Sequence, residues 1–153
     1  MNPEDRILVF TLDEQRYALA LPIVEQVFLM VEITPLPKDL ATVQGIINVH
    51  GSLIPVYNLR RRFGIPVREI ETSDQLIIIH TNNRRVAIPV DRVEDVIKLT
   101  DKPVEAGDIL PSIPYINGVV KLPDGLILIH DPDTFLSLDE KKVLDEALSR
   151  GSA

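Results

Sequence analysis

Three histidines, His50, His80 and His130, are the side chains best suited to acid–base or nucleophilic chemistry near neutral pH. None lies in a recognised nucleophile motif, and the sequence contains no cysteine and no Gly-x-Ser-x-Gly segment. His130 followed by Asp131 could serve a small β-barrel hydrolase or a metal site. A strand-end histidine before a capping aspartate is the more common arrangement, so catalysis is the less favoured interpretation.

Metal and phosphate sites are also disfavoured. A calcium loop beginning at Asp131 would need Gly at its sixth position and Glu at its twelfth, where Leu136 and Lys142 stand. The seven glycines are isolated from one another, so no glycine-rich loop can cradle a phosphate. A net charge of -7 would repel a nucleic-acid backbone. We therefore predict no enzymatic activity, no metal, no cofactor and no nucleic-acid partner.

The elements that must position any site are short strands. Apolar or β-branched runs separated by turn residues recur along the 153 residues, which are enough for one domain. The runs are 7–12, 17–21, 46–49, 53–57, 76–79, 86–88, 96–99, 119–122 and 126–129. Their spacing, with almost no helical periodicity before residue 137, favours an all-β barrel over a βαβ fold.

Two helices are predicted. Ser137-Leu-Asp-Glu140 has the form of a capping box, and an apolar stripe follows it, which indicates a C-terminal helix over about 137–150. Leu59–Phe63 is expected to form a short helical turn ending at Gly64. The arginine run within that turn is interpreted as a solvated face.

An internal duplication divides the chain. Tyr17–Val27 overlays Val86–Val96 at an offset of 69 residues, and Val43–Val49 overlays Ile116–Leu122 at an offset of 73. The identical pairs in the first overlay are Ala18/Ala87, Val24/Val93, Glu25/Glu94 and Val27/Val96. We predict one domain over 1–153 made of two β modules, about 5–65 and 74–136, with a groove between them.

The segment Val43-Gln-Gly-Ile-Ile-Asn-Val-His-Gly-Ser-Leu-Ile-Pro-Val-Tyr-Asn-Leu-Arg60 resembles the signature of CheW-like domains, G-[IV]-[IV]-N-L-R-G-x-[IV]-[IV]-P-V-x-[DN]-L. The resemblance extends over nearly the whole chain. Its other parts are 8–12, 24–27, 33–37, 90–96 and 116–131. No kinase or receiver module is attached, so the chain is similar to a stand-alone CheW adaptor.

The resemblance implies two intertwined, SH3-like five-stranded β-barrel subdomains with a C-terminal helix. It also implies a non-enzymatic adaptor that couples the cytoplasmic tips of methyl-accepting chemoreceptors to the regulatory domain of a CheA-type histidine kinase, in bacterial or archaeal chemosensory signalling. The acidic N-terminal residues and short apolar runs agree with a cytoplasmic protein that is recruited to membrane-associated arrays without inserting into the bilayer.

The resemblance also implies which residues of this chain would form the binding sites. The receptor-binding groove would contain Val24, Gln26, Gly45, Asn48, His50, Val93 and Val96. The kinase would be contacted near Leu76 and Val86. His50 stands where the family usually has arginine, which replaces a permanent charge with a largely neutral ring.

Other interpretations stay open at this point. The valines of the proposed groove could be core residues. The chain could serve a CheW-like scaffold in a non-flagellar pathway, or it could be a hydrolase using His130 and Asp131. A generic SH3-like peptide binder is disfavoured because only 5% of residues are aromatic and tryptophan is absent.

Overall fold

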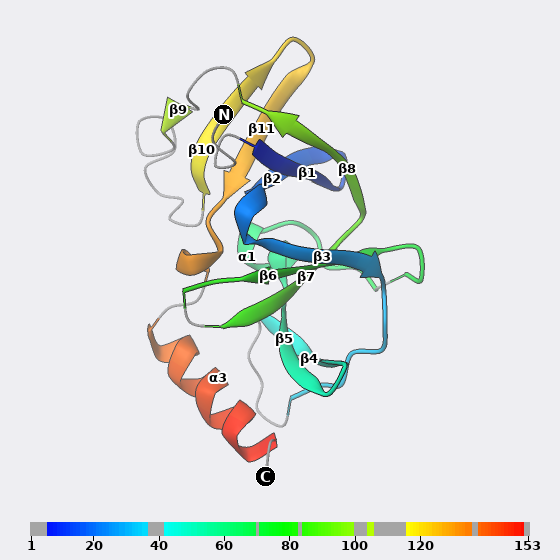
Figure 1. Cartoon of the computed structure of the whole chain (residues 1–153), viewed down its shortest axis with the longest axis vertical. Coiled ribbons are helices and arrows are strands. Elements are labelled where there is room, and N and C mark those ends of the chain that lie inside the picture. Colours follow the sequence, from blue (N-terminus) through cyan, green and yellow to red (C-terminus); the bar gives the residue numbers. More distant parts are fainter. Residues whose placement is uncertain are drawn as a thin grey trace.

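A computed structural model describes residues 6–36, 42–69, 71–82, 84–99, 104–105, 116–135 and 138–151 (Figure 1). Within these ranges the chain is mostly β-strand, as predicted. The strands are β1 (Arg6–Leu12), β2 (Gln15–Ala20), β3 (Val24–Leu29), β4 (Val43–Val49), β5 (Ser52–Tyr57), β6 (Gln75–His80), β7 (Arg85–Val90), β8 (Arg92–Lys98), β9 (Val104–Glu105), β10 (Ile116–Leu122) and β11 (Gly125–His130). The helical elements are η2 (Leu21–Ile23), α1 (Leu59–Phe63), η3 (Pro132–Thr134) and α3 (Leu138–Gly151).

The strands form two sheets. The first sheet has the order β8-β1-β2-β11-β10-β9 and lies in the upper part of Figure 1, whereas the second has the order β3-β6-β7-β5-β4 and lies below it. Each sheet takes strands from both halves of the chain, through parallel pairing of β2 with β11 and of β5 with β7. The intertwined arrangement is confirmed. The segments 5–65 and 74–136 are therefore not separate structural units.

The duplication predicted from sequence is a topological repeat. Exchanging β1 with β6, β2 with β7, β3 with β8, β4 with β10 and β5 with β11 converts the order of the second sheet into that of the first, apart from the short β9. Register breaks occur at equivalent places. Glu25 and Glu94 are the extra residues in β3 and β8, and Gln44 and Asn117 are those in β4 and β10. The identical glutamates of the overlay thus mark a shared β-bulge.

The hairpins β1–β2 and β6–β7 are buried on both faces, which explains their continuous apolar sequences. Alternate side chains of each hairpin enter different clusters. The central cluster, which both sheets share, contains Leu8, Phe10, Leu12, Tyr17, Leu19, Ile77, Ile79, Val86, Ile88 and neighbouring residues. One further cluster lies within the first sheet, around Ile7, Val9 and Ile127, and another within the second, around Ile47, Leu76 and Ile78.

Strand β3 was not predicted. Its exposed Glu25 and Gln26 and its bulge interrupt the two-residue alternation that identifies a half-buried strand. The strand predicted over 17–21 corresponds to β2 and ends one residue earlier, at Ala20. Leu21 instead begins the 3-10 turn that contains Pro22.

Both predicted helices are present. In α1 the Asn58 side chain accepts a hydrogen bond from the Arg61 amide at 3.1 Å, and Gly64 ends the helix in the left-handed conformation (φ +72°). Helix α3 packs on the central cluster through fully buried Leu144 and through Leu148. The predicted cap, Ser137, lies outside the described residues. Among the described helices, none combines the length and apolar content that a bilayer crossing requires.

Candidate binding site

A recess opens between the two edge strands of the second sheet. Its volume is about 280 Å³, and it is lined by Gln26, Phe28, Val31, Asn48, Val49 and His50. Because β3 and β4 stand at opposite ends of the strand order, their joint lining of one recess shows that the sheet curls until its edges face each other. Thr34 and Ile46 exchange two backbone hydrogen bonds, of 2.9 and 2.8 Å, which hold the chain after β3 against β4.

Three of the residues that line this recess are apolar and three are polar. Large apolar side chains are also exposed around it. Leu29, the last residue of β3, is 66% exposed, and Val31, two residues further along the chain, is 42% exposed. Leu53, opposite Asn48 in the β4–β5 pair, is 40% exposed. Exposed apolar groups beside a few polar ones are typical of protein-binding surfaces.

The turn between β4 and β5 fixes one wall of the recess. His50 and Gly51 both have positive φ, +51° and +87°, as a two-residue turn of the I′ kind requires. The Asn48 Oδ1 accepts a hydrogen bond from the Gly51 amide at 2.8 Å, which stabilises that turn. Asn48 therefore shapes the recess in addition to lining it.

The structure brings together only some of the predicted receptor-binding residues. Gln26, Asn48 and His50 line the recess. Gly45 is buried on β4, where an added Cβ would lie 2.2 Å from the Thr34 carbonyl oxygen, so its role is close packing of backbone. The predicted valines are placed differently.

Val24 and Val93 are half-buried and pack against the central cluster, as the core interpretation expected. Val96 lies on β8 in the first sheet and is 44% exposed. None of these three valines lines the recess.

Leu76 and Val86 are fully buried on the inner strands β6 and β7. Neither side chain is accessible to a partner, so the prediction that a kinase contacts them does not hold for the side chains. Continuous apolar runs in the sequence mark strands covered on both faces, and such strands offer little surface.

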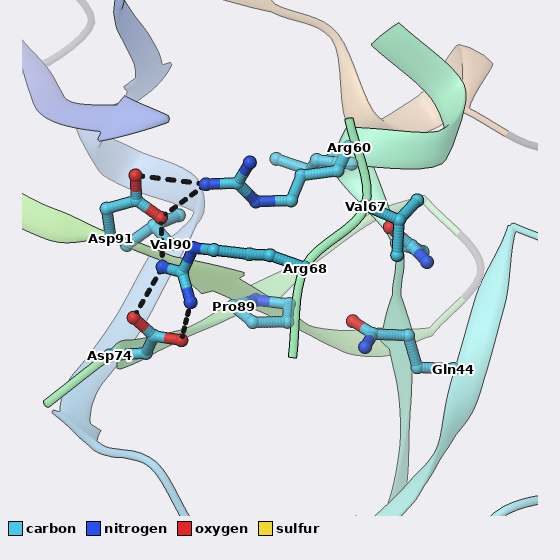
Figure 2. A pocket seen from close by; sticks show the side chains of 10 residues that line it. Gln44, Arg60, Val67, Arg68, Asp74, Pro89, Val90 and Asp91 are labelled. Atoms are coloured by element: carbon cyan, nitrogen blue, oxygen red, sulfur yellow. Dashed lines mark hydrogen bonds and ion pairs between the residues drawn. The ribbon is translucent and has the colours of Figure 1, made fainter. Parts of the chain in front are cut away.

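A second polar cluster, the charged junction, consists of Asp13, Arg60, Arg68, Asp74 and Asp91. Figure 2 shows Arg60 and Arg68 converging on Asp91. Asp91 accepts from Arg60 Nη2 at 2.8 Å, from Arg68 Nη2 at 2.5 Å, and from the Asp13 amide at 2.8 Å. The Arg60 guanidinium also reaches Asp13 at 2.8 Å. The junction thus connects the β1–β2 turn of the first sheet with the end of β7 in the second.

The electrostatics of this junction favour the charged forms. Burial by itself raises the pKa of Asp91, but hydrogen bonds from the Asp13 amide, Arg60 and Arg68 outweigh it and hold that pKa below its usual value. A two-point contact with Asp74, at 2.7 and 3.0 Å, raises the pKa of Arg68. A cavity of about 30 Å³ beside these groups has room for about one water molecule.

The interpretation of the arginine run as a solvated face is only partly right. Arg60 belongs to the junction, and its side chain is 10% exposed. Arg62 pairs with Glu140 of α3 at 2.5 Å and lies over the Phe135 ring. Arg61 alone of the three is exposed. The acidic partners of Arg60 and Arg62 lie 31 to 78 residues away in the sequence, so no local pattern could identify them.

The hydrolase alternative is not supported. His130 is 2% exposed, with its ring edge-on to Phe63 (centroids 5.3 Å apart) and Phe135 (6.1 Å). The Asp131 side chain accepts from the Asp133 amide at 3.1 Å and caps η3. Packing and capping account for both residues. Within the described ranges, no group of three or more His, Asp or Glu side chains is placed to hold a metal ion.

These features define a class of protein. A curled β-sheet with an open recess of apolar and uncharged polar groups has the surface of a module that binds other proteins.

Comparison with known proteins identifies the family. The model of the CheW-like domain matches residues 6–140, and the chain belongs to this family. It is 32% identical to the chemotaxis protein CheW of Thermotoga maritima, over 94% of this chain and 89% of the relative. It is 26% identical to that of Bacillus subtilis, over 90% of each chain. The crystal structure of scaffolding protein TtCheW from Thermoanaerobacter tengcongensis superimposes with a TM-score of 0.80 at 29% identity, over 90% of this chain and 95% of that one.

Proposed function

We propose that this protein is a non-enzymatic adaptor of chemosensory signalling that couples the cytoplasmic tip of a chemoreceptor to a CheA-type histidine kinase. Membership of the CheW family supports the proposal, as do relatives named as chemotaxis proteins and a similar solved structure named as a scaffolding protein. The observation that carries it is the recess, because it brings Gln26 of β3 together with Asn48 of β4 and with His50 of the turn that follows β4. The adaptor would work in the cytoplasm, at membrane-associated receptor arrays.

The recess suits one face of an amphipathic helix. An apolar side chain of the receptor hairpin would fill the space beside Phe28 and Val31, and this burial supplies affinity. The amides of Gln26 and Asn48 would then fix the register of the helix by hydrogen bonds to its polar groups. No bond is made or broken in this role.

The kinase would use a different surface. We place its contact on the first sheet, where Val96 on β8 and Leu126 on β11 are large exposed apolar residues. Separate surfaces on the two sheets would let one molecule hold receptor and kinase together, which is what a coupling protein must do.

Val31→Glu tests the receptor surface. Val31 is 42% exposed, so a carboxylate there leaves the free protein folded, but docking of an apolar side chain would have to desolvate the charge. We expect at least about a tenfold loss of affinity for a purified receptor hairpin fragment with an unchanged melting temperature, measured by calorimetry and thermal unfolding.

Leu126→Glu is the matched control. It places the same charge on a side chain that is 47% exposed on the other sheet, and receptor affinity should not change. In a kinase assay containing receptor, Leu126→Glu should instead reduce kinase recruitment. Receptor binding by Val31→Glu at full affinity would overturn the placement of the receptor surface.

A further inference from the structure

We propose that Asp13 is a positioning residue for the coupling function: its contacts with Arg60 and Asp91 fix the orientation of the first sheet relative to the second, and this orientation transmits receptor control to the kinase. The inference rests on the proposed adaptor function and adds to it a residue that touches neither partner. It concerns the charged junction, which lies between the surface that we assign to the receptor and the surface that we assign to the kinase.

The junction lies where the chain passes from one sheet to the other. Asp91 follows the last residue of β7 in the second sheet and precedes the first residue of β8 in the first sheet. Asp13 lies in the β1–β2 turn of the first sheet, where its carboxylate accepts from Arg60 Nη2 at 2.8 Å and its amide donates to Asp91 at 2.8 Å. Apolar contacts in the central cluster attract the two sheets without fixing a direction, whereas these two hydrogen bonds do fix one.

The β1–β2 turn has a conformation that its residues do not favour. Asp13 and Glu14, which form the two-residue connection between β1 and β2, have φ of +50° and +74°. Asn-Gly is the pair that best suits such a turn, and positive φ at a non-glycine residue costs free energy. Strained backbone of this kind persists where surrounding contacts impose it. Here the imposing contacts are those that Asp13 makes with Arg60 and Asp91.

The turn is connected in its other direction to the surface assigned to the kinase. Gln15, the first residue of β2, donates from Nε2 to the Leu126 carbonyl oxygen at 3.1 Å. Arg16 pairs with Asp124 at 3.0 Å, and β2 then pairs in parallel with β11. A shift of the β1–β2 turn would therefore also shift the exposed side chain of Leu126.

The opposite side of the junction is connected to the recess. Arg60 lies in α1, which is capped by Asn58. The Asn58 amide donates to the Thr42 carbonyl oxygen, directly before β4, at 2.8 Å. Strand β4 continues to Asn48, which lines the recess. The contact between Arg60 and Asp13 thus joins the hairpin that forms the recess to the hairpin that supports the Leu126 surface.

Asp13→Ala tests this role. The Asp13 side chain is 46% exposed, so its loss leaves the protein folded and both binding surfaces intact. We expect the affinities for a purified receptor hairpin fragment and for the kinase to stay within about twofold, whereas the receptor-dependent change in kinase autophosphorylation should fall at least about fivefold. Asp13→Gly, which suits positive φ but lacks the carboxylate, should show the same loss of control.

Two further variants separate positioning from a merely structural role. Asp13→Asn keeps an acceptor oxygen and a residue type that tolerates positive φ, so it should retain most of the receptor control. Glu14→Ala changes the other residue of the turn with positive φ, whose side chain is not part of the junction, and it should retain full control. Thermal unfolding of each variant shows that the compared proteins are folded.

Full receptor control in Asp13→Ala and Asp13→Gly would overturn the positioning role, as would an equal loss of control in Glu14→Ala. A loss of control that accompanies an equal loss of affinity, or a lower melting temperature, in both Asp13→Ala and Asp13→Gly would also overturn it, because Asp13 would then act in binding or in stability. Absence of receptor binding by the unmodified chain would overturn the proposed function itself, and this inference with it.

Discussion

The charged junction and the recess are both polar clusters, yet they use polarity in opposite ways. In the junction, Arg60 and Arg68 form ion pairs with three aspartates at 2.5 to 2.8 Å, and the charged groups face one another. In the recess, Gln26, Asn48 and His50 surround an open volume beside exposed apolar side chains. Polar groups that form hydrogen bonds and ion pairs with one another stabilise the fold. Polar groups that face an open recess can instead bind a partner.

Asp91→Ala should cause the largest effect. It removes the carboxylate shared by two guanidinium groups and leaves the mostly buried Arg60 with Asp13 as its acidic partner and with the Pro66 carbonyl oxygen. We expect the free energy of unfolding to fall by about 3 kcal/mol, measured by urea denaturation. Asp124→Ala, which breaks an exposed pair with Arg16, is the control and should leave stability unchanged. Equal stability of the two variants would show that the junction does not hold the sheets together.

Gly45→Ala tests the backbone contact that closes the second sheet. The added Cβ would lie 2.2 Å from the Thr34 carbonyl oxygen, so the chain after β3 must move away from β4. We expect a loss of about 2 kcal/mol in unfolding free energy together with weaker receptor binding. Gly51→Ala has open space around the new Cβ but a φ of +87°, so its cost should be about 1 kcal/mol. A neutral Gly45→Ala would contradict the described closure of the sheet.

Val24→Glu and Gln26→Ala test which residues of β3 belong to the core and which belong to the recess. Val24 is half-buried against the central cluster, so a charge there should lower the unfolding free energy by about 1 to 2 kcal/mol. Gln26 is exposed and lines the recess, so its truncation should lower receptor affinity with little effect on the melting temperature. Loss of affinity without loss of stability in Val24→Glu, together with loss of stability in Gln26→Ala, would place Val24 in the recess and Gln26 in the core.

Acid titration distinguishes Asp91 from Asp131. The folded-state pKa of Asp91 lies below the usual 3.8, so its contribution to stability is complete above that value and is lost as pH falls through the folded pKa. Burial raises the pKa of Asp131, so its contribution is complete below 3.8 and is lost as pH rises through its folded pKa.

Urea denaturation between pH 2.5 and 7 would measure both contributions. The stability difference between the unmodified chain and Asp91→Asn should shrink towards low pH, whereas that for Asp131→Asn should change in the opposite direction. A difference for Asp91→Asn that stays constant below pH 3.8 would contradict the role of its ionised form.

Much of the fold could be predicted from local patterns. The hairpins β1–β2 and β6–β7 have continuous apolar runs because they are buried on both faces. The overlay of the two halves matched Glu25 with Glu94, and the strand pairing shows that both are bulge residues. Strand β3 could not be found in this way, because a bulged edge strand loses the alternation on which such predictions depend.

The site was harder to predict, and tertiary structure decided it. The sequence by itself determined most of the strands, the duplication, the family signature and the presence of Gln26, Asn48 and His50. It did not determine that these three residues share a recess while Val24 packs inward, nor that Arg60 meets Asp91. Strand pairing joins residues far apart in the chain, and the curl of a sheet determines which side of a strand is covered. Burial is a property of those long-range contacts, so only the folded chain separates a binding residue from a core residue of the same type.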